Sequence, residues 1–128
     1  MDFNDTPEEA KFRKEAFEWL KANAPLKEGP KDGWRAASEE DGLKEVKVWQ
    51  KKLHEAGWAC MHWPKAFGGR ESTPIERVIW GQEVSKFKVP GGYLEIGQGM
   101  AGPVMMMYAT EEQKERYLPP LATGEEIW

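Results

Sequence analysis

The chain lacks several features that mark particular classes of protein. Its 128 residues contain one cysteine, Cys60, so no internal disulfide can form, and we expect a reducing, cytoplasmic compartment. No apolar run approaches the roughly 20 residues that a membrane helix needs, and no basic segment followed by an apolar one marks a secretory leader. The net charge of −4, with scattered basic residues, gives no general attraction to nucleic-acid phosphates. We therefore expect a protein with no membrane span and no nucleic-acid partner.

Patterns typical of β-sheets, metal sites and nucleotide folds are equally scarce. Almost no stretch alternates apolar and polar residues, and no hairpin turn joins two β-rich runs. His54 and His62 lack the i,i+4 partnering and the Cys/Asp clustering of a metal site. The sequence Gly97-Gln-Gly99 follows no predicted strand, so a dinucleotide-binding fold is not supported. Cys60 has apolar neighbours, and we interpret it as a small buried hydrophobic residue rather than a nucleophile.

Signals for α-helices dominate what is present. Thr6, Thr73 and Thr110 are each followed three residues later by Glu or Gln, which is the capping-box pattern of a helix start. Ser38 precedes three acidic residues, and negative charge is favoured at the positive end of a helix dipole. The predicted helix ends are marked by Pro25, Gly57, Pro90-Gly91-Gly92 and Pro119-Pro120, with a last turn to Thr123 capped by Gly124.

Apolar residues at helical spacing predict the buried faces. These faces comprise Phe12, Ala16 and Leu20, then Leu43, Val46, Trp49, Leu53 and Ala56, then Ile75, Val78, Ile79 and Phe87. Gly99 and Gly102 are three apart, which would let another backbone or a ligand come close. Pro103 either begins a helical stretch or kinks one, and residues 104–107 are predicted to be buried or nearly so. The pattern as a whole predicts an all-α bundle of five or six helices, forming one domain over residues 1–128.

Three segments carry a resemblance to a known family. The last nineteen residues, from Thr110-Glu-Glu-Gln to Ile-Trp128, are similar to the end of the N-terminal helical domain of acyl-CoA dehydrogenases. Trp63-Pro-Lys-Ala-Phe-Gly-Gly69 resembles that family's Trp-Pro-x-x-aromatic-Gly-Gly loop, and Gly99-Met-Ala-Gly-Pro-Val104 resembles its helix marked by Gly and Pro. Ala109 departs from the Gly that the family commonly has before Thr-Glu-Glu-Gln. The three motifs occur in the family's order, and the resemblance covers nearly the whole chain.

The resemblance implies a role in binding an acyl group. In the family, the segment that matches residues 92–104 helps to line the pocket for the distal end of the acyl chain, which makes Tyr93, Ile96 and Met100 the candidate substrate-binding residues. Met100 and the three methionines at 105–107 are interpreted either as core packing or as an apolar wall for that chain. No catalytic, cofactor-binding or metal-ligating residue is transferred to this sequence.

The family also implies partners that this sequence does not contain. Its members hold FAD non-covalently and desaturate acyl-CoA thioesters, with the base in a C-terminal domain and the flavin held mainly by a middle β-domain, the C-terminal domain and a neighbouring subunit. We therefore expect an N-terminal fragment that is inactive alone and does not retain FAD. The parent enzyme is expected to form homo-oligomers and to pass electrons to an electron-transferring flavoprotein.

Two alternatives remain open at this stage. The first is a stand-alone helical interaction module with no enzymatic parent. The second is a domain of a related flavoenzyme, such as an acyl-CoA oxidase or a flavin monooxygenase, which only the position of the base in the missing C-terminal domain would distinguish.

Overall fold

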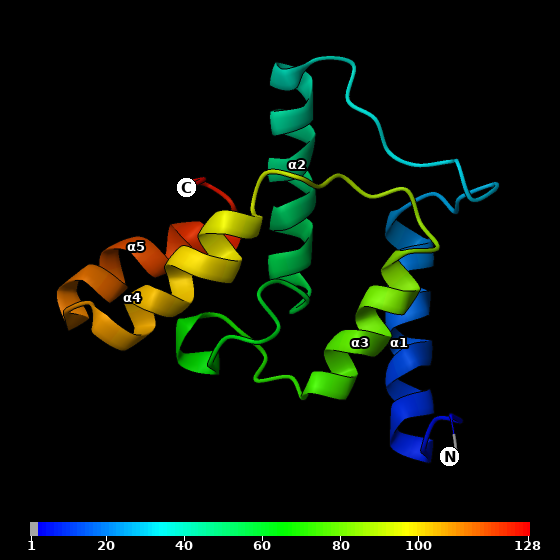
Figure 1. The fold of residues 1–128 in the computed structure, drawn as a ribbon, viewed down its shortest axis with the longest axis horizontal. Helices are drawn as coiled ribbons and strands as arrows, with labels where there is room; N and C mark the ends of the chain where they lie inside the picture. Colours follow the sequence, from blue (N-terminus) through cyan, green and yellow to red (C-terminus); the bar gives the residue numbers. More distant parts are fainter. Residues whose placement is uncertain (1–2) are drawn as a thin grey trace. The chain divides into compact units, whose positions relative to one another are not determined.

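A computed structural model describes residues 3–128, and the regular elements among them are all helices, as predicted. The α-helices are α1 (Pro7–Asn23), α2 (Glu39–Glu55), α3 (Pro74–Val84), α4 (Gly102–Tyr108) and α5 (Glu111–Thr123). A 3-10 turn, η1 (Lys65–Phe67), and a π-helical turn, η2 (Gly97–Ala101), complete the order of elements (Figure 1). None of the helices in this described part has the length and apolar character needed to cross a membrane.

The helix starts follow the caps that the sequence predicts. The side chains of Thr6, Thr73 and Thr110 each accept a hydrogen bond from the backbone amide three residues later, and the side-chain oxygen of the Glu or Gln there accepts one from the amide of the Thr. The Ser38 side chain caps α2 by accepting a hydrogen bond from the Asp41 amide, without the second bond of a capping box. These contacts are local, since each joins residues three positions apart, which explains why the sequence pattern alone located the starts.

The chain divides into two compact units, and the first draws on Met1–Trp34 and Thr73–Val89. Within it α1 and α3 lie side by side (Figure 1). The buried side chains of α1 are Phe12, Ala16 and Leu20, as predicted. Aromatic pairs add to this contact, because the Phe17 and Phe87 rings lie 5.7 Å apart and the Trp19 and Trp80 rings 6.2 Å apart.

The prediction for the buried face of α3 is only partly correct. Ile79 is buried, and so is Phe87 in the segment that follows α3, but Ile75 and Val78 are exposed. Val78 lies about 100° around the helix axis from Ile79, and Ile75 belongs to the first turn. The other buried residue of α3 is Glu83, a carboxylate that the sequence analysis did not place in the core.

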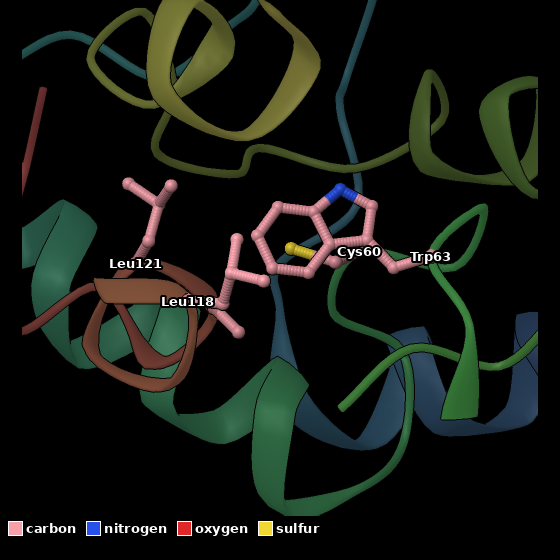
Figure 2. Close-up of a cluster of buried hydrophobic side chains, with 5 residues drawn as sticks. Cys60, Trp63, Leu118 and Leu121 are labelled. Atoms are coloured by element: carbon pink, nitrogen blue, oxygen red, sulfur yellow. The ribbon is translucent and has the colours of Figure 1, made fainter. Parts of the chain in front are cut away.

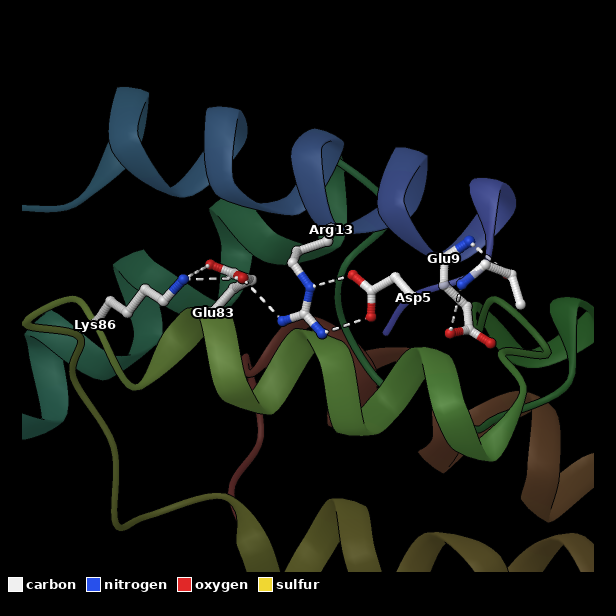
Figure 3. A network of polar contacts seen from close by, with 6 residues as sticks. Asp5, Glu9, Arg13, Glu83 and Lys86 are labelled. Atoms are coloured by element: carbon white, nitrogen blue, oxygen red, sulfur yellow. Dashed lines mark hydrogen bonds and ion pairs between the residues drawn. The ribbon is translucent and has the colours of Figure 1, made fainter. Parts of the chain in front are cut away.

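Glu83 is held by two basic side chains. Arg13 Nη1 lies 3.0 Å from Glu83 Oε1, and Lys86 Nζ lies 2.7 Å from Oε2 (Figure 3). Arg13 also donates from Nε to Asp5, and this bond lowers the pKa of the Asp5 carboxyl. Elsewhere in the same unit, the pKa of Asp32 is lowered by the backbone amide of Glu28 and by Lys88. The paired cations make burial of the carboxylate tolerable, since an unpaired charge would be strongly unfavourable there.

The second unit contains Arg35–Ser72 and Pro90–Trp128. Its buried cluster is formed by Cys60, Trp63, Leu118, Leu121 and Ala122 (Figure 2). Phe67, Met105 and Met106 are partly buried and pack against this cluster. The cluster therefore joins the irregular segment after α2 to α4 and α5.

Helix α5 contradicts one predicted helix end. Pro119 and Pro120 do not terminate it, because the helix continues to Thr123 and ends at Gly124, whose φ of +81° is the predicted left-handed cap. Each proline removes one helical hydrogen bond to a carbonyl four residues earlier. Those carbonyls belong to residues 115 and 116, which are exposed and can be hydrated. Continuing the helix buries Leu121 completely, and this burial offsets the lost bonds.

Candidate functional site

The candidate site lies on the helical segment that runs from residue 95 to Tyr108. It begins as an α-helix, passes through the π turn η2 and continues as α4, with Pro103 in the first turn of α4. Pro103 thus stands in the first turn of α4, at the point where the π turn passes into it. In η2 the amide of Gly102 donates to the carbonyl of Gly97, five residues earlier instead of four. Such single π turns are uncommon in helices and often occur at functional sites.

One side of this segment packs against the buried cluster. Gly102 lies so close to the Trp63 ring that a Cβ at this position would collide with the ring, and a Cβ at Gly97 would come within 2.8 Å of Leu121 Cδ1. Gly99, by contrast, has open space beside it. The sequence had indicated a close approach at Gly99 and Gly102; the glycines that allow it are Gly97 and Gly102. The π turn explains the spacing of five, because it widens the turn to accommodate one more residue.

Hydrogen bonds also hold the π turn at Gln98. The indole Nε1 of Trp63 donates to the Gln98 carbonyl at 3.0 Å, and the Gln98 side chain donates from Nε2 to the Leu121 carbonyl at 3.0 Å. Neither residue was predicted to be functional. The sequence held no signal for the π turn, because Pro103 removes one helical donor whichever register the helix adopts.

The opposite side of the segment is apolar and exposed. Its large side chains are Ile96, Met100, Val104, Met107 and Tyr108. Ile96 lies just before the π turn, Met100 lies within it, and Val104, Met107 and Tyr108 lie after it in α4. Val104 and Met107 were predicted to be buried and are not, while Met105 and Met106 reach the core. The segment therefore has two apolar faces, one covered within its unit and one open in the described chain.

The three predicted acyl-binding residues are placed as follows. Ile96 and Met100 are each 65% exposed and belong to the open face. Tyr93 is half-buried in the bend that precedes the helix. Glu95, which lies between Tyr93 and Ile96 in the sequence, accepts a hydrogen bond from the Gly92 amide at 3.0 Å, and this bond stabilises the start of the helix. The structure thus places Ile96 and Met100 on one surface, with Tyr93 just before it.

Other parts of the described chain offer less for chemistry. A hollow of about 520 Å³ between α2 and the end of α5 is lined by Val48 and by polar residues such as Lys47 and Lys51. No three His, Cys, Asp or Glu side chains within residues 3–128 are grouped so that they could hold a metal ion. Burial raises the pKa of the Cys60 thiol to about 12, which keeps it protonated and agrees with its interpretation as a buried hydrophobic residue.

The sequence of this helical chain matches that of known proteins. The family model described as "Acyl-CoA dehydrogenase, N-terminal domain" matches residues 6–125. The chain belongs to the acyl-CoA dehydrogenase family. A curated relative, the acyl-CoA dehydrogenase IpdE1 of Mycolicibacterium smegmatis strain ATCC 700084, is 32% identical over 124 residues, which cover 91% of this chain and 30% of IpdE1.

Solved structures show the same fold. The Tcur3481-Tcur3483 steroid ACAD aligns with a TM-score of 0.71 and 26% identity, over 99% of this chain and 32% of that one. The ChsE4-ChsE5 complex from Mycobacterium tuberculosis aligns with a TM-score of 0.65 and 24% identity, over 98% of this chain and 30% of that one. This acyl-CoA dehydrogenase chain therefore spans about a third of the length of the proteins that it matches.

The acyl-CoA dehydrogenase family implies FAD for the complete protein. Among residues 3–128, no buried side-chain nitrogen or oxygen lacks a hydrogen-bond partner. The open face of η2 and α4 offers apolar side chains, which suit a hydrocarbon group better than a charged dinucleotide.

Proposed function

We propose that this chain acts as the N-terminal domain, over residues 1–128, of an FAD-dependent acyl-CoA dehydrogenase, and that Tyr93, Ile96 and Met100 form part of the wall for the acyl chain. The observation that carries the proposal is the open apolar face of η2 and α4, in a chain whose family match extends over nearly its whole length. That match covers residues of both compact units, which supports treating them as one domain.

The proposed role is that of a wall and not of a complete pocket. A ligand pocket normally buries most of the ligand surface, whereas Ile96 and Met100 are mostly open in this chain. The facing side of the pocket must then come from protein outside residues 1–128. Methionine suits such a wall because its flexible, polarisable side chain adapts to the shape of an apolar ligand. Each methylene that the wall helps to bury adds about 0.8 kcal/mol to binding.

Several further features of the proposed function belong to the complete protein. Desaturation of the acyl-CoA and retention of FAD would require the additional domains, so residues 1–128 alone are expected to be inactive. The relative IpdE1 is named an acyl-CoA dehydrogenase, which favours dehydrogenation over the oxidase and monooxygenase alternatives. The likeness to a steroid ACAD makes a sterol-derived acyl-CoA the first substrate to compare with straight-chain ones. The match to a ChsE4-ChsE5 complex is compatible with an oligomer; an electron-transferring flavoprotein is the proposed acceptor.

The test enlarges the side chain at the wall in the protein made from the complete reading frame. In Met100→Trp the larger ring should obstruct the distal end of long or bulky acyl groups. We expect kcat/KM to fall at least about tenfold for those substrates and less than about twofold for the shortest acyl-CoA, because roughly 1.4 kcal/mol corresponds to a factor of ten. Turnover is measured by reduction of an artificial electron acceptor.

Val48→Trp provides the matched control. Val48 is 61% exposed on α2 and lies outside the open apolar face, so the same added ring should leave the substrate profile unchanged. An equal loss with every acyl length in Met100→Trp, or the same profile change in Val48→Trp, would contradict a wall at Met100. Absence of acyl-CoA oxidation by the complete protein with any acyl-CoA would contradict the proposed activity itself.

A further inference from the structure

We infer that Trp63 and Gln98 are positioning residues for the proposed acyl wall: the indole N–H of Trp63 keeps residues 97–101 in a π register, and this register determines where Ile96 and Met100 face. The consequence of this positioning for substrate binding rests on the proposed function. The hydrogen bonds that set the register lie within the second unit of this chain and stand independently of it.

Pro103 supplies no hydrogen-bond donor in either helical register. In the observed π turn, the Gly102 amide is bonded to the Gly97 carbonyl and not to that of Gln98, and the next position, 103, has no N–H to replace it. In an α register, the Gly102 amide would instead serve Gln98, and the carbonyl of Gly99 would lose the donor at position 103.

Trp63 decides between these two registers. It donates to the Gln98 carbonyl at 3.0 Å, so the carbonyl that the π register leaves without a helical partner is satisfied. Gly99 is exposed, so water could serve its carbonyl in the α register. Without the indole donor, the half-buried Gln98 carbonyl would be unpaired in the π register, which is unfavourable. Removal of that donor should therefore favour the α register.

Two packing contacts support the same register. Gly97 and Gly102 lie against Leu121 and the Trp63 ring at a spacing of five residues, which fits one wide turn. The Gln98 side chain is bonded to the Leu121 carbonyl at 3.0 Å, which fixes the turn to the end of α5. Gln98 is thus held through its backbone by the irregular segment after α2 and through its side chain by α5.

The register affects the open face because the C-terminal end of the segment, α4, is fixed by packing on the core cluster. Met105 and Met106 pack on the core cluster and fix α4. A change from π to α upstream would then rotate the residues before the turn by about one residue, which is about 100° and 1.5 Å along a helix. Ile96 would then face a different direction relative to Val104 and the rest of α4, which changes the shape of the open face.

The experiment uses Trp63→Phe in the protein made from the complete reading frame. Phenylalanine keeps an aromatic ring in the core and removes the N–H. Trp58→Phe is the matched control, since Trp58 is buried in the same segment and its ring contacts Arg70 at 4.1 Å. Gln98→Met is the second variant; it keeps the side-chain length, removes the bond to Leu121 and leaves the Trp63 core intact. Each variant is analysed by crystallography and with a series of acyl-CoAs.

We expect Trp63→Phe crystals to show the Gly102 amide bonded to the Gln98 carbonyl. The ratio of kcat/KM for bulky to short acyl-CoA should change at least about tenfold, through KM, while kcat with the shortest substrate stays within about twofold. Gln98→Met should change the ratio in the same direction by a smaller factor, and Trp58→Phe by less than about twofold. A general loss of stability would instead lower turnover for all acyl lengths together.

Three results would overturn the inference. The first is a π register retained in Trp63→Phe, and the second is an unchanged acyl-CoA ratio in both Trp63→Phe and Gln98→Met while Met100→Trp does change it. The third is a change in Trp58→Phe that equals the change in Trp63→Phe. If Met100→Trp also leaves the ratio unchanged, the proposed wall itself is wrong, and the positioning role falls with it. The Met100 variant thus separates failure of the positioning from failure of the function.

Discussion

Replacing Arg13 by methionine would leave the buried carboxylate of Glu83 with one cation instead of two. The side chain of Glu83 is 1% exposed, and its ion pairs are to Arg13 at 3.0 Å and to Lys86 at 2.7 Å. Methionine retains much of the aliphatic stem of arginine, so the packing of α1 on α3 should be largely preserved. The change therefore tests the charge more than the volume.

The expected magnitude follows from burial. Removing one partner of a buried ion pair typically costs about 3–5 kcal/mol. Because Lys86 remains bound to Glu83, we expect roughly 2–3 kcal/mol for Arg13→Met. The Lys44–Glu40 pair has the same N–O distance of 3.0 Å, but its side chains are 69% and 78% exposed, so Lys44→Met should cost only about 0.3–0.5 kcal/mol. Equal distances with unequal burial make the two variants a matched pair.

The assay is native-state hydrogen exchange of amides in α1 and α3, which reports on the first unit by itself. A loss of about 2–3 kcal/mol corresponds to roughly 30- to 150-fold faster exchange. The double variant Arg13→Met/Glu83→Leu should recover most of the loss, because no buried charge is then left unpaired. The reasoning is refuted if Arg13→Met accelerates exchange in its unit no more than Lys44→Met does in α2, or if the double variant is less stable than Arg13→Met.

Three further predictions concern single sites. Gly102→Ala should destabilise the second unit by roughly 1–3 kcal/mol because the new methyl group would overlap the indole ring beside it, whereas Gly99→Ala, which meets open space, should leave the melting temperature unchanged or higher. Cys60, with a pKa of about 12, should not react with iodoacetamide at pH 8 until the protein is unfolded in urea; mass spectrometry of the native protein would show the opposite if the thiol were accessible. The lowered pKa values of Asp5 and Asp32 mean that their stabilising contribution is complete above the unfolded value of about 4 and is lost as pH falls further. Urea titrations between pH 5 and pH 2 should show the free energy of unfolding fall with pH, and this fall should be smaller in Asp5→Asn.

The sequence predicted best what is determined locally. The caps at Thr6, Thr73 and Thr110 involve atoms three residues apart, so their positions follow from short patterns. The end of α2 and its glycine cap follow for the same reason, since Gly57 has a φ of +81° that other residues adopt only at a cost. The family resemblance also depended on short motifs and was confirmed by the match over residues 6–125.

The errors arise where distant residues decide the outcome. Pro119 and Pro120 carry a local stop signal, but burial of Leu118 and Leu121 against the rest of the unit keeps the helix intact. Val78 has the apolar character of a core residue, yet Glu83 occupies the buried face because Arg13 approaches from α1, 70 positions away. The π turn required Trp63, 35 positions from Gln98, and no helical period in the sequence reveals a partner at that distance.

The segment from Ile96 to Tyr108 combines these two kinds of information. Its core face is specified by close contacts at Gly97 and Gly102, where substitution would force the helix away from its neighbours. Its open face is specified only by apolar side chains, and such a face is stable in water only to a limited extent. A helix whose position is fixed from one side can present side chains to a ligand on the other side with little loss of order. The core contact and the exposed methionines and isoleucine are therefore consistent parts of one arrangement, in which the packing would determine the geometry of the proposed wall.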